Sequence, residues 1–176
     1  MIEVNIAITK DNKFILHHEL DQDGMIISQH PRSLFKGIEL QSLLRRLVKP
    51  VCIHIKWDPR VSPNHVARQL YQTLSAFKRQ WIKIYLFTFD IPLLACLRIK
   101  FEYHITIGWL IQDETLWDPH QDCDIVCADY RIAHIIATHK LLFIFTISDM
   151  NHIRHLQRID GIISDTISTL KSDLLK

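Results

Sequence analysis

Hydrophobic residues occupy every second position at the start of the chain. From Ile2 to Ile8 the even positions hold isoleucine or valine, a period of two that predicts a β-strand whose two faces have different neighbours. Glu3 and Asn5 therefore point to the same face. A carboxylate and a carboxamide are costly to bury without polar partners, so we expect this face to look into a polar site.

A polar turn follows this strand and reverses the chain. Residues 10–13 are Lys-Asp-Asn-Lys, and the apolar run Phe14–Leu16 after them predicts a short second strand. That strand ends in His17 and His18. We expect this pair to bring histidine back toward Glu3.

Short apolar runs then alternate with helical stripes. Strands are expected at residues 51–56, 82–89, 105–111, 124–128, 141–147 and 161–164. Helices are expected at residues 38–48, 62–78, 92–99, 130–139, 149–157 and 168–175. The second helix should begin with a capping hydroxyl at Ser62 and with Pro63 in its first turn. This alternation predicts an α/β fold of right-handed parallel βα units. With the first strand there are about seven, one short of a closed (β/α)8 barrel of about 250 residues.

Length and hydropathy are consistent with one buried core. A chain of 176 residues can bury one sizeable core, so we expect a single domain over residues 1–176. Hydrophobic residues make up 48% of the chain and the mean hydropathy is +0.05, which parallel strands covered on both faces explain. No run approaches the ~20 apolar residues of a membrane span. The N-terminus lacks the basic and apolar segments of a secretory signal.

Charge and cysteine usage narrow the classes of function. A formal net charge of +2 is too small to indicate nucleic acid or an anionic membrane surface as a partner. The four cysteines lie in apolar surroundings and form no CxxC motif; they are Cys52, Cys96, Cys123 and Cys127. We expect reduced core cysteines rather than disulfides or zinc ligands, and hence a cytoplasmic protein.

A series of short motifs runs along nearly the whole chain. They read EVN at residues 3–5, TKDN at 9–12, HH at 17–18, IHIK at 53–56, TFD at 88–90, FTISD at 145–149 and IDGIISD at 159–165. In this order and spacing the chain resembles the glycerophosphodiester phosphodiesterases, of the phospholipase C-like barrel class. The resemblance implies a TIM-type (β/α) barrel lacking its first βα unit, because the family's initial His-Arg-Gly strand and the helix after it precede the motifs found here.

The resemblance also implies a site. His17 stands at the position of a catalytic histidine, and Lys56 and Phe145 stand at positions that line the substrate. The family's first catalytic histidine and its phosphate-binding arginine belong to the missing unit. The positions of the family's metal ligands hold Glu3, Asn5 and His54.

Two carboxylates of the family's metal site are replaced in this chain. Asn5 stands for an aspartate and His54 for a glutamate, which removes about two negative charges from a site for Ca²⁺ or Mg²⁺, ions that prefer oxygen ligands. Zn²⁺ is an alternative, held by Glu3 with these two residues and a histidine from residues 17–18. A site without metal is the third option. In that case Glu3 and Asn5 would be a hydrogen-bonded polar pair, His54 a core histidine, and Lys56 a partner of Glu3.

Two functions follow from the resemblance. The first is hydrolysis of glycerophosphodiesters to glycerol 3-phosphate and an alcohol, weak or lost because a missing acid–base group commonly removes a factor of ~10²–10⁴. The second is a non-catalytic protein that binds a phosphorylated ligand or a protein partner through the same mouth.

Without the first unit, the strands at Ile2 and Gly161 would have open edges. We therefore expect a collapsed barrel, a homodimer across the gap, or a fragment of a longer enzyme.

Overall fold

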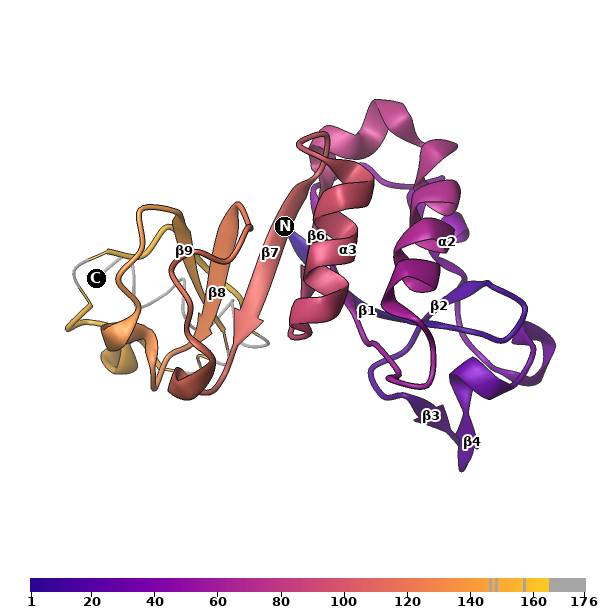
Figure 1. The fold of residues 1–176 in the computed structure, drawn as a ribbon, viewed down its shortest axis with the longest axis horizontal. Coiled ribbons are helices and arrows are strands. Elements are labelled where there is room, and N and C mark those ends of the chain that lie inside the picture. Colours follow the sequence, from indigo (N-terminus) through magenta and orange to yellow (C-terminus); the bar gives the residue numbers. More distant parts are fainter. Residues whose placement is uncertain (146, 148, 157, 165–176) are drawn as a thin grey trace. The chain divides into compact units, whose positions relative to one another are not determined.

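Two compact units make up the chain. The computed structural model describes residues 1–145, 147, 149–156 and 158–164. The units are Met1–Ile107 and Gly108–Lys176. Figure 1 shows the course of the chain through each unit.

Three parallel strands are the centre of the first unit. β1 (Ile2–Ile8), β5 (Val51–Ile55) and β6 (Ile84–Thr88) pair in the order β1-β5-β6. β2 (Phe14–Leu16) runs antiparallel to the C-terminal half of β1, where Ile6 pairs with Leu16. Every residue of β5 is buried, which is why this strand reads as a continuous apolar run.

Two helices of this unit pack against each other. α2 (Pro63–Ser75) and α3 (Ile91–Phe101) lie side by side in Figure 1. α2 buries Val66, Leu70 and Leu74, which form an apolar stripe within the helix predicted over residues 62–78. Ser62 is the N-cap, but its hydroxyl makes no capping hydrogen bond, so that part of the prediction was wrong. Pro63 does occupy the first turn, where its fixed φ favours the start of a helix.

The other elements of the first unit are short. They are α1 (Leu40–Leu44), the ribbon of β3 (Asp21–Gln22) with β4 (Met25–Ile26), and the 3-10 turns η1 (Ile27–Gln29), η2 (Arg32–Leu34) and η3 (Lys78–Lys83). The helix predicted over residues 38–48 was therefore wrong in extent. Ile38 and Val48, at the ends of its apolar stripe, are exposed. Without burial of those ends, further turns gain too little to offset the cost of ordering them.

Parallel strands also form the second unit. β7 (Thr106–Ile111), β8 (Ile125–Asp129), β9 (Leu141–Phe145) and β10 (Gly161–Ile162) pair in this order. In the described part of the chain, the connections between them carry the 3-10 turns η4 (Glu114–Leu116), η5 (Ala133–Ile135) and η6 (Met150–His152).

Two of the predicted helices fall in these connections. The helix expected over residues 130–139 was wrong, because only η5 forms there. The segment is rich in isoleucine and histidine, whose helix propensity is modest, and it contributes few buried side chains. The described part of residues 149–157 is likewise a 3-10 turn, η6. Residues 168–175 lie outside the described residues.

The α/β class and the number of parallel strands are confirmed. Seven strands with parallel neighbours occur among the described residues: β1, β5, β6, β7, β8, β9 and β10. The open edge expected at β1 was partly wrong, because β2 pairs with Ile6–Ile8 and covers that half of the strand. The single domain over residues 1–176 and the homodimer stay predictions.

Cysteine burial agrees with the sequence analysis. Cys52, Cys123 and Cys127 are buried free thiols, and Cys96 is a half-buried one.

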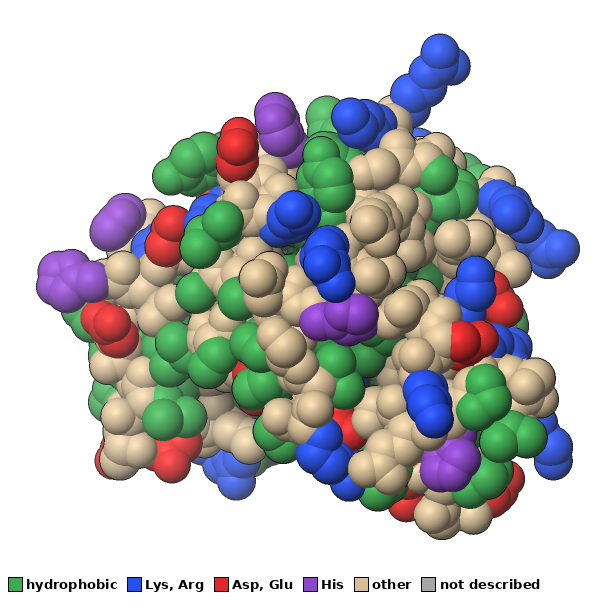
Figure 2. Space-filling model, turned by 45° about the vertical axis from the view of Figure 1, so that its right-hand side comes forward, with side chains coloured by type: hydrophobic (Ala, Val, Ile, Leu, Met, Phe, Trp, Pro, Cys, Tyr) green, Lys and Arg blue, Asp and Glu red, His purple; other side chains and the backbone are tan. Residues whose placement is uncertain are grey.

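On the face shown in Figure 2, acidic side chains lie among the basic ones. Within the residues that the structure describes, the helices are too short or too polar to cross a membrane.

Candidate functional site

Two neighbouring strands bring four polar or sulfur-bearing side chains to one face. In the parallel register of β1 and β5, Glu3 is opposite Cys52 and Asn5 is opposite His54. Residues at matching positions of adjacent strands point to the same side of a sheet, so these side chains share a face. Lys56 comes directly after β5 and two residues after His54, so its side chain is expected on the same face. The sequence predicted this convergence correctly.

The hairpin places His17 beside the same strand. Its backbone N–H donates to the carbonyl oxygen of Asn5 over 3.0 Å, so the chain returns to the level of that residue, as predicted. His17 is half-buried, and its Nδ1 lies 3.1 Å from the carbonyl oxygen of Glu19. His18 is exposed and contacts the Glu19 carboxylate through Nδ1.

His54 is a buried histidine at the centre of this face. His54 is 5% exposed, and its ring packs edge-on against the ring of Phe89 with 5.2 Å between the two ring centroids. Burial is the largest cause that lowers the pKa of His54 to about 3, and the nearby charges of Lys56 and His18 contribute to the same shift. The imidazole is therefore neutral near pH 7.

The contact between His54 and Glu3 is thus not an ion pair. The Nδ1 atom of His54 lies 4.0 Å from Oε1 of Glu3. This distance is too long for a hydrogen bond, and a neutral imidazole has no charge to pair with the carboxylate. The burial of the ring agrees with the alternative of a core histidine, and ligation of a metal by His54 stays a prediction.

Lys56 carries a positive charge at the end of β5. Its backbone N–H donates to the carbonyl oxygen of Ile6 over 2.9 Å, which continues the pairing of β1 with β5 by one residue. The side chain is half-buried. Its ammonium group is close enough to oppose protonation of His54. It also helps to lower the pKa of Glu19, although His18 is the larger cause.

A buried aspartate orders the loop that follows Lys56. Asp58 is 2% exposed and accepts hydrogen bonds from the Ser28 hydroxyl and from the backbone N–H and Nε of Arg60. Burial alone would raise the pKa of Asp58, but these hydrogen bonds hold it below its ordinary value. Asp58 was missed in the sequence, where the only signal was an acidic residue shortly after an apolar strand.

Phe89, the aromatic residue that packs against His54, was also not predicted as part of the site. Phe89 follows β6 and belongs to the TFD motif, but the sequence assigned it no role at the site. Phe145, the aromatic that the resemblance implied, ends β9 in the second unit and pairs with Asp129 of β8. Its role toward substrate stays a prediction, as do the roles of His17 and Lys56.

The donor set does not fit the implied divalent metal. Among the described residues, no three His, Cys, Asp or Glu side chains come together as metal ligands. Structural and catalytic zinc sites need three or four protein ligands, and Ca²⁺ needs six or more oxygens. Glu3 and His54 supply two donors 4.0 Å apart, and the Lys56 ammonium group near them opposes a cation.

Solved structures share this fold over nearly the whole chain. A glycerophosphodiester phosphodiesterase from Parabacteroides distasonis matches with a TM-score of 0.82 and 14% identity, over 98% of this chain and 82% of that one. A phosphodiesterase from Oleispira antarctica, in complex with the product sn-glycerol-3-phosphate, matches with a TM-score of 0.82 and 14% identity, over 99% and 84% of the two chains. A glycerophosphodiester phosphodiesterase from Thermotoga maritima matches with a TM-score of 0.69 and 18% identity, over 97% and 83%. No protein-family model and no curated protein matches the chain.

Proposed function

We propose that this chain, which has the fold of the glycerophosphodiester phosphodiesterases, binds a small phosphorylated molecule of the glycerol phosphate class on the face of β1 and β5. We propose further that it hydrolyses glycerophosphodiesters weakly or not at all. The observation that carries the proposal is the convergence of Lys56 and His17 with Glu3, Asn5 and His54 on that face. The phosphodiesterase from Oleispira antarctica, which has the same fold, was solved with sn-glycerol-3-phosphate.

Lys56 is the group best suited to hold a phosphate. An ammonium group donates charge-assisted hydrogen bonds to phosphate oxygens, and these are roughly twice as strong as neutral ones. The half-buried position of Lys56 reduces competition from water. His17 ends the hairpin beside Asn5 of β1 and offers a second polar group for the ligand.

Weak or absent turnover is supported by the residues at the implied metal positions, and His54 does not replace the missing acid–base group. A general acid–base catalyst works best with a pKa near the working pH, whereas the pKa of His54 is about 3. His54 therefore stays neutral and supplies no acid at neutral pH. Glu3 provides the carboxylate among the implied metal positions, which is too little negative charge to hold a hard divalent cation beside a lysine.

Calorimetric titration with sn-glycerol-3-phosphate in EDTA tests binding. We expect saturable binding that Lys56→Met weakens by about tenfold or more, the effect of losing one hydrogen bond to a charged group. Lys49→Met, at an exposed lysine just before β5, is the matched control and should bind like the parent protein. Equal affinities of the two variants, or no binding to the parent protein, would refute the proposal.

Residual hydrolysis is the second candidate, favoured by the position of His17 beside Asn5. Release of glycerol 3-phosphate from glycerophosphocholine is measured in EDTA and with Ca²⁺, Mg²⁺, Mn²⁺ or Zn²⁺ in turn. Turnover that His17→Ala abolishes and that the exposed control His104→Ala leaves intact would establish the enzyme. Turnover that both variants retain would point to a contaminating hydrolase.

A further inference from the structure

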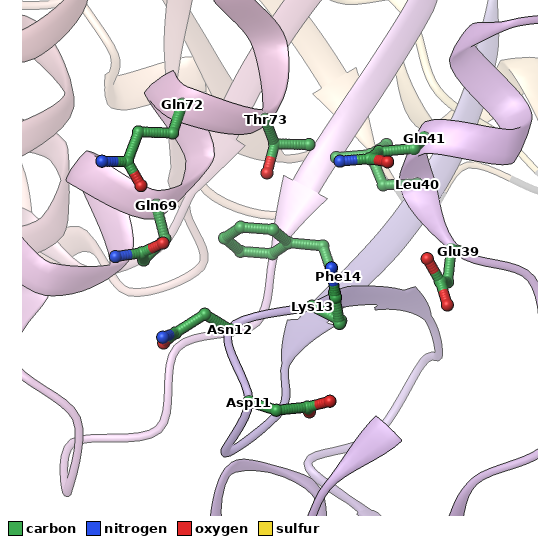
Figure 3. A pocket seen from close by; sticks show the side chains of 10 residues that line it. All are labelled: Asp11, Asn12, Lys13, Phe14, Glu39, Leu40, Gln41, Gln69, Gln72 and Thr73. Carbon is green, nitrogen blue, oxygen red and sulfur yellow. The ribbon is translucent and has the colours of Figure 1, made fainter. Parts of the chain in front are cut away.

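A polar pocket lies away from the β1–β5 face, between the tip of the first hairpin, α1 and α2. Its volume is about 250 Å³, and Figure 3 shows its lining. None of the five residues of the first unit assigned to the candidate site lines it. The lining residues are Asp11, Asn12, Lys13, Phe14, Glu39, Leu40, Gln41, Gln69, Gln72 and Thr73.

The walls of this pocket are held in place by the fold. Gln72 and Thr73 come three and four residues after Gln69 on α2, so both lie on the same face of the helix as Gln69. The hairpin tip opposite is fixed by Thr9, whose hydroxyl donates to Asp11 over 2.7 Å. The tip is tied to α2 by a contact of 2.6 Å between Nε2 of His65 and the side-chain oxygen of Asn12. A ligand would therefore meet a largely preformed site.

Four polar side chains of the lining have hydrogen-bonding capacity to offer. Within the described part of the chain, the amides of Gln41, Gln69 and Gln72 and the hydroxyl of Thr73 make no hydrogen bond with the protein. Each amide carries two N–H donors and one acceptor oxygen, and the hydroxyl can both donate and accept a hydrogen bond. In Figure 3 the Thr73 hydroxyl points toward the middle of the pocket.

The floor of the pocket offers little apolar surface. Phe14 is 3% exposed and Leu40 is 1% exposed, so both rest in the core. Binding must then come from polar contacts. Ligand pockets for drug-sized molecules are roughly 300–1,000 Å³, so this smaller pocket suits a small ligand.

The charges of the lining disfavour an anion. Asp11 and Glu39 contribute two carboxylates and Lys13 one ammonium group, and the Arg32 side chain beside the pocket lies 3.5 Å from the Glu39 carboxylate, so there is no net positive charge for an anion. Asp11 already accepts hydrogen bonds from Thr9 and from the backbone N–H of Arg32. A phosphate would find no net positive charge here, whereas uncharged hydroxyl groups can pair with both amides and carboxylates.

We propose that this pocket is a second binding site, for a neutral and hydroxyl-rich small molecule, a polyol or a monosaccharide. The amides of α1 and α2 exchange hydrogen bonds with its hydroxyl groups, and the carboxylates of Asp11 and Glu39 accept further ones. The site is independent of the phosphate ligand proposed for the β1–β5 face.

The test uses the side-chain amide signals of the ¹⁵N-labelled full chain. Glycerol, myo-inositol and glucose are titrated separately, with inorganic phosphate and trimethylamine as charged probes. We expect saturable shifts of the glutamine side-chain signals with at least one polyol or sugar. The double variant Gln69→Leu with Thr73→Val should weaken this binding by about tenfold or more, since it removes two hydrogen-bonding groups.

Matched variants make each outcome decisive. Gln29→Leu, at an exposed glutamine outside the pocket, should bind the polyol like the parent protein. Lys56→Met should do the same, which separates this site from the phosphate site. The proposal is overturned if no polyol or sugar gives saturable shifts, if Gln29→Leu weakens binding as much as the double variant, or if only phosphate or trimethylamine binds.

Discussion

Acid should destabilise this protein through one buried histidine. The pKa of His54 is lowered to about 3, against an ordinary value of 6.5, because the ring is buried and lies near the positive charges of Lys56 and His18. Between pH 6.5 and about 3, the unfolded chain therefore binds a proton at His54 that the folded chain does not bind. Stability must fall as the pH drops below 6.5.

The magnitude follows from the difference in pKa. Between the two values, each pH unit costs about 1.4 kcal/mol. From pH 7.5 to pH 5.0 the contribution of His54 amounts to a loss of about 2 kcal/mol, and the loss continues down to a pH near 3. The Glu3 carboxylate 4.0 Å away favours protonation, but burial and the two cations outweigh it.

Urea unfolding followed by the fluorescence of the four tryptophans measures this effect. The free energy of unfolding is determined at several pH values between 7.5 and 5.0 for the parent protein and for His54→Gln, which cannot take up the proton. The difference between the two curves should change by about 2 kcal/mol over this range. His104→Gln, at a side chain that is 68% exposed, is the control and should follow the parent protein.

Parallel curves for the parent protein and His54→Gln would refute the reasoning. They would mean that the folded state accepts the proton as readily as the unfolded chain does. The argument that His54 supplies no acid at neutral pH would then be wrong as well, because its pKa would lie near the working pH.

Three further predictions concern stability. Ser28→Ala should cost about 1–3 kcal/mol, because the buried Asp58 loses the hydroxyl that donates to it. Gly161→Ala should cost about 1–3 kcal/mol, because a Cβ atom there would lie 2.9 Å from the ring of Phe143 and force it to move. Leu70→Ala should cost about 2–5 kcal/mol, because the side chain is fully buried in the stripe of α2 and its loss leaves a cavity.

Urea midpoints at pH 7.5 measure all three changes. Ser33→Ala, at an exposed serine, is the control for Ser28→Ala, and Leu34→Ala, at a half-exposed leucine, is the control for Leu70→Ala. A Ser28→Ala variant as stable as Ser33→Ala would show that Asp58 needs no hydroxyl partner. An unchanged midpoint for Gly161→Ala would mean that the Phe143 ring moves aside freely. A loss below 1 kcal/mol for Leu70→Ala would mean that the core collapses into the space.

Periodicity was enough to locate the parallel strands and the two long helices. Buried parallel strands leave continuous apolar runs such as residues 51–55, and α2 shows its buried face as a stripe at spacing four. Both patterns are local, so the sequence displays them directly. The short helices were overpredicted because an apolar stripe says nothing of whether its ends will be covered, as Ile38 and Val48 show.

The sequence by itself also determined which residues share a face within each strand, because the period of two follows from strand geometry alone. The pairing of β1 with β5, and the register that sets Asn5 opposite His54, belong to the tertiary structure. Only the tertiary structure decided what those residues can do. It buried His54 against Phe89 near Lys56 and so made it neutral, while Glu3 stayed partly exposed. The charge of a group depends on the solvent and partners that distant segments remove or supply, and no local pattern of residues records them.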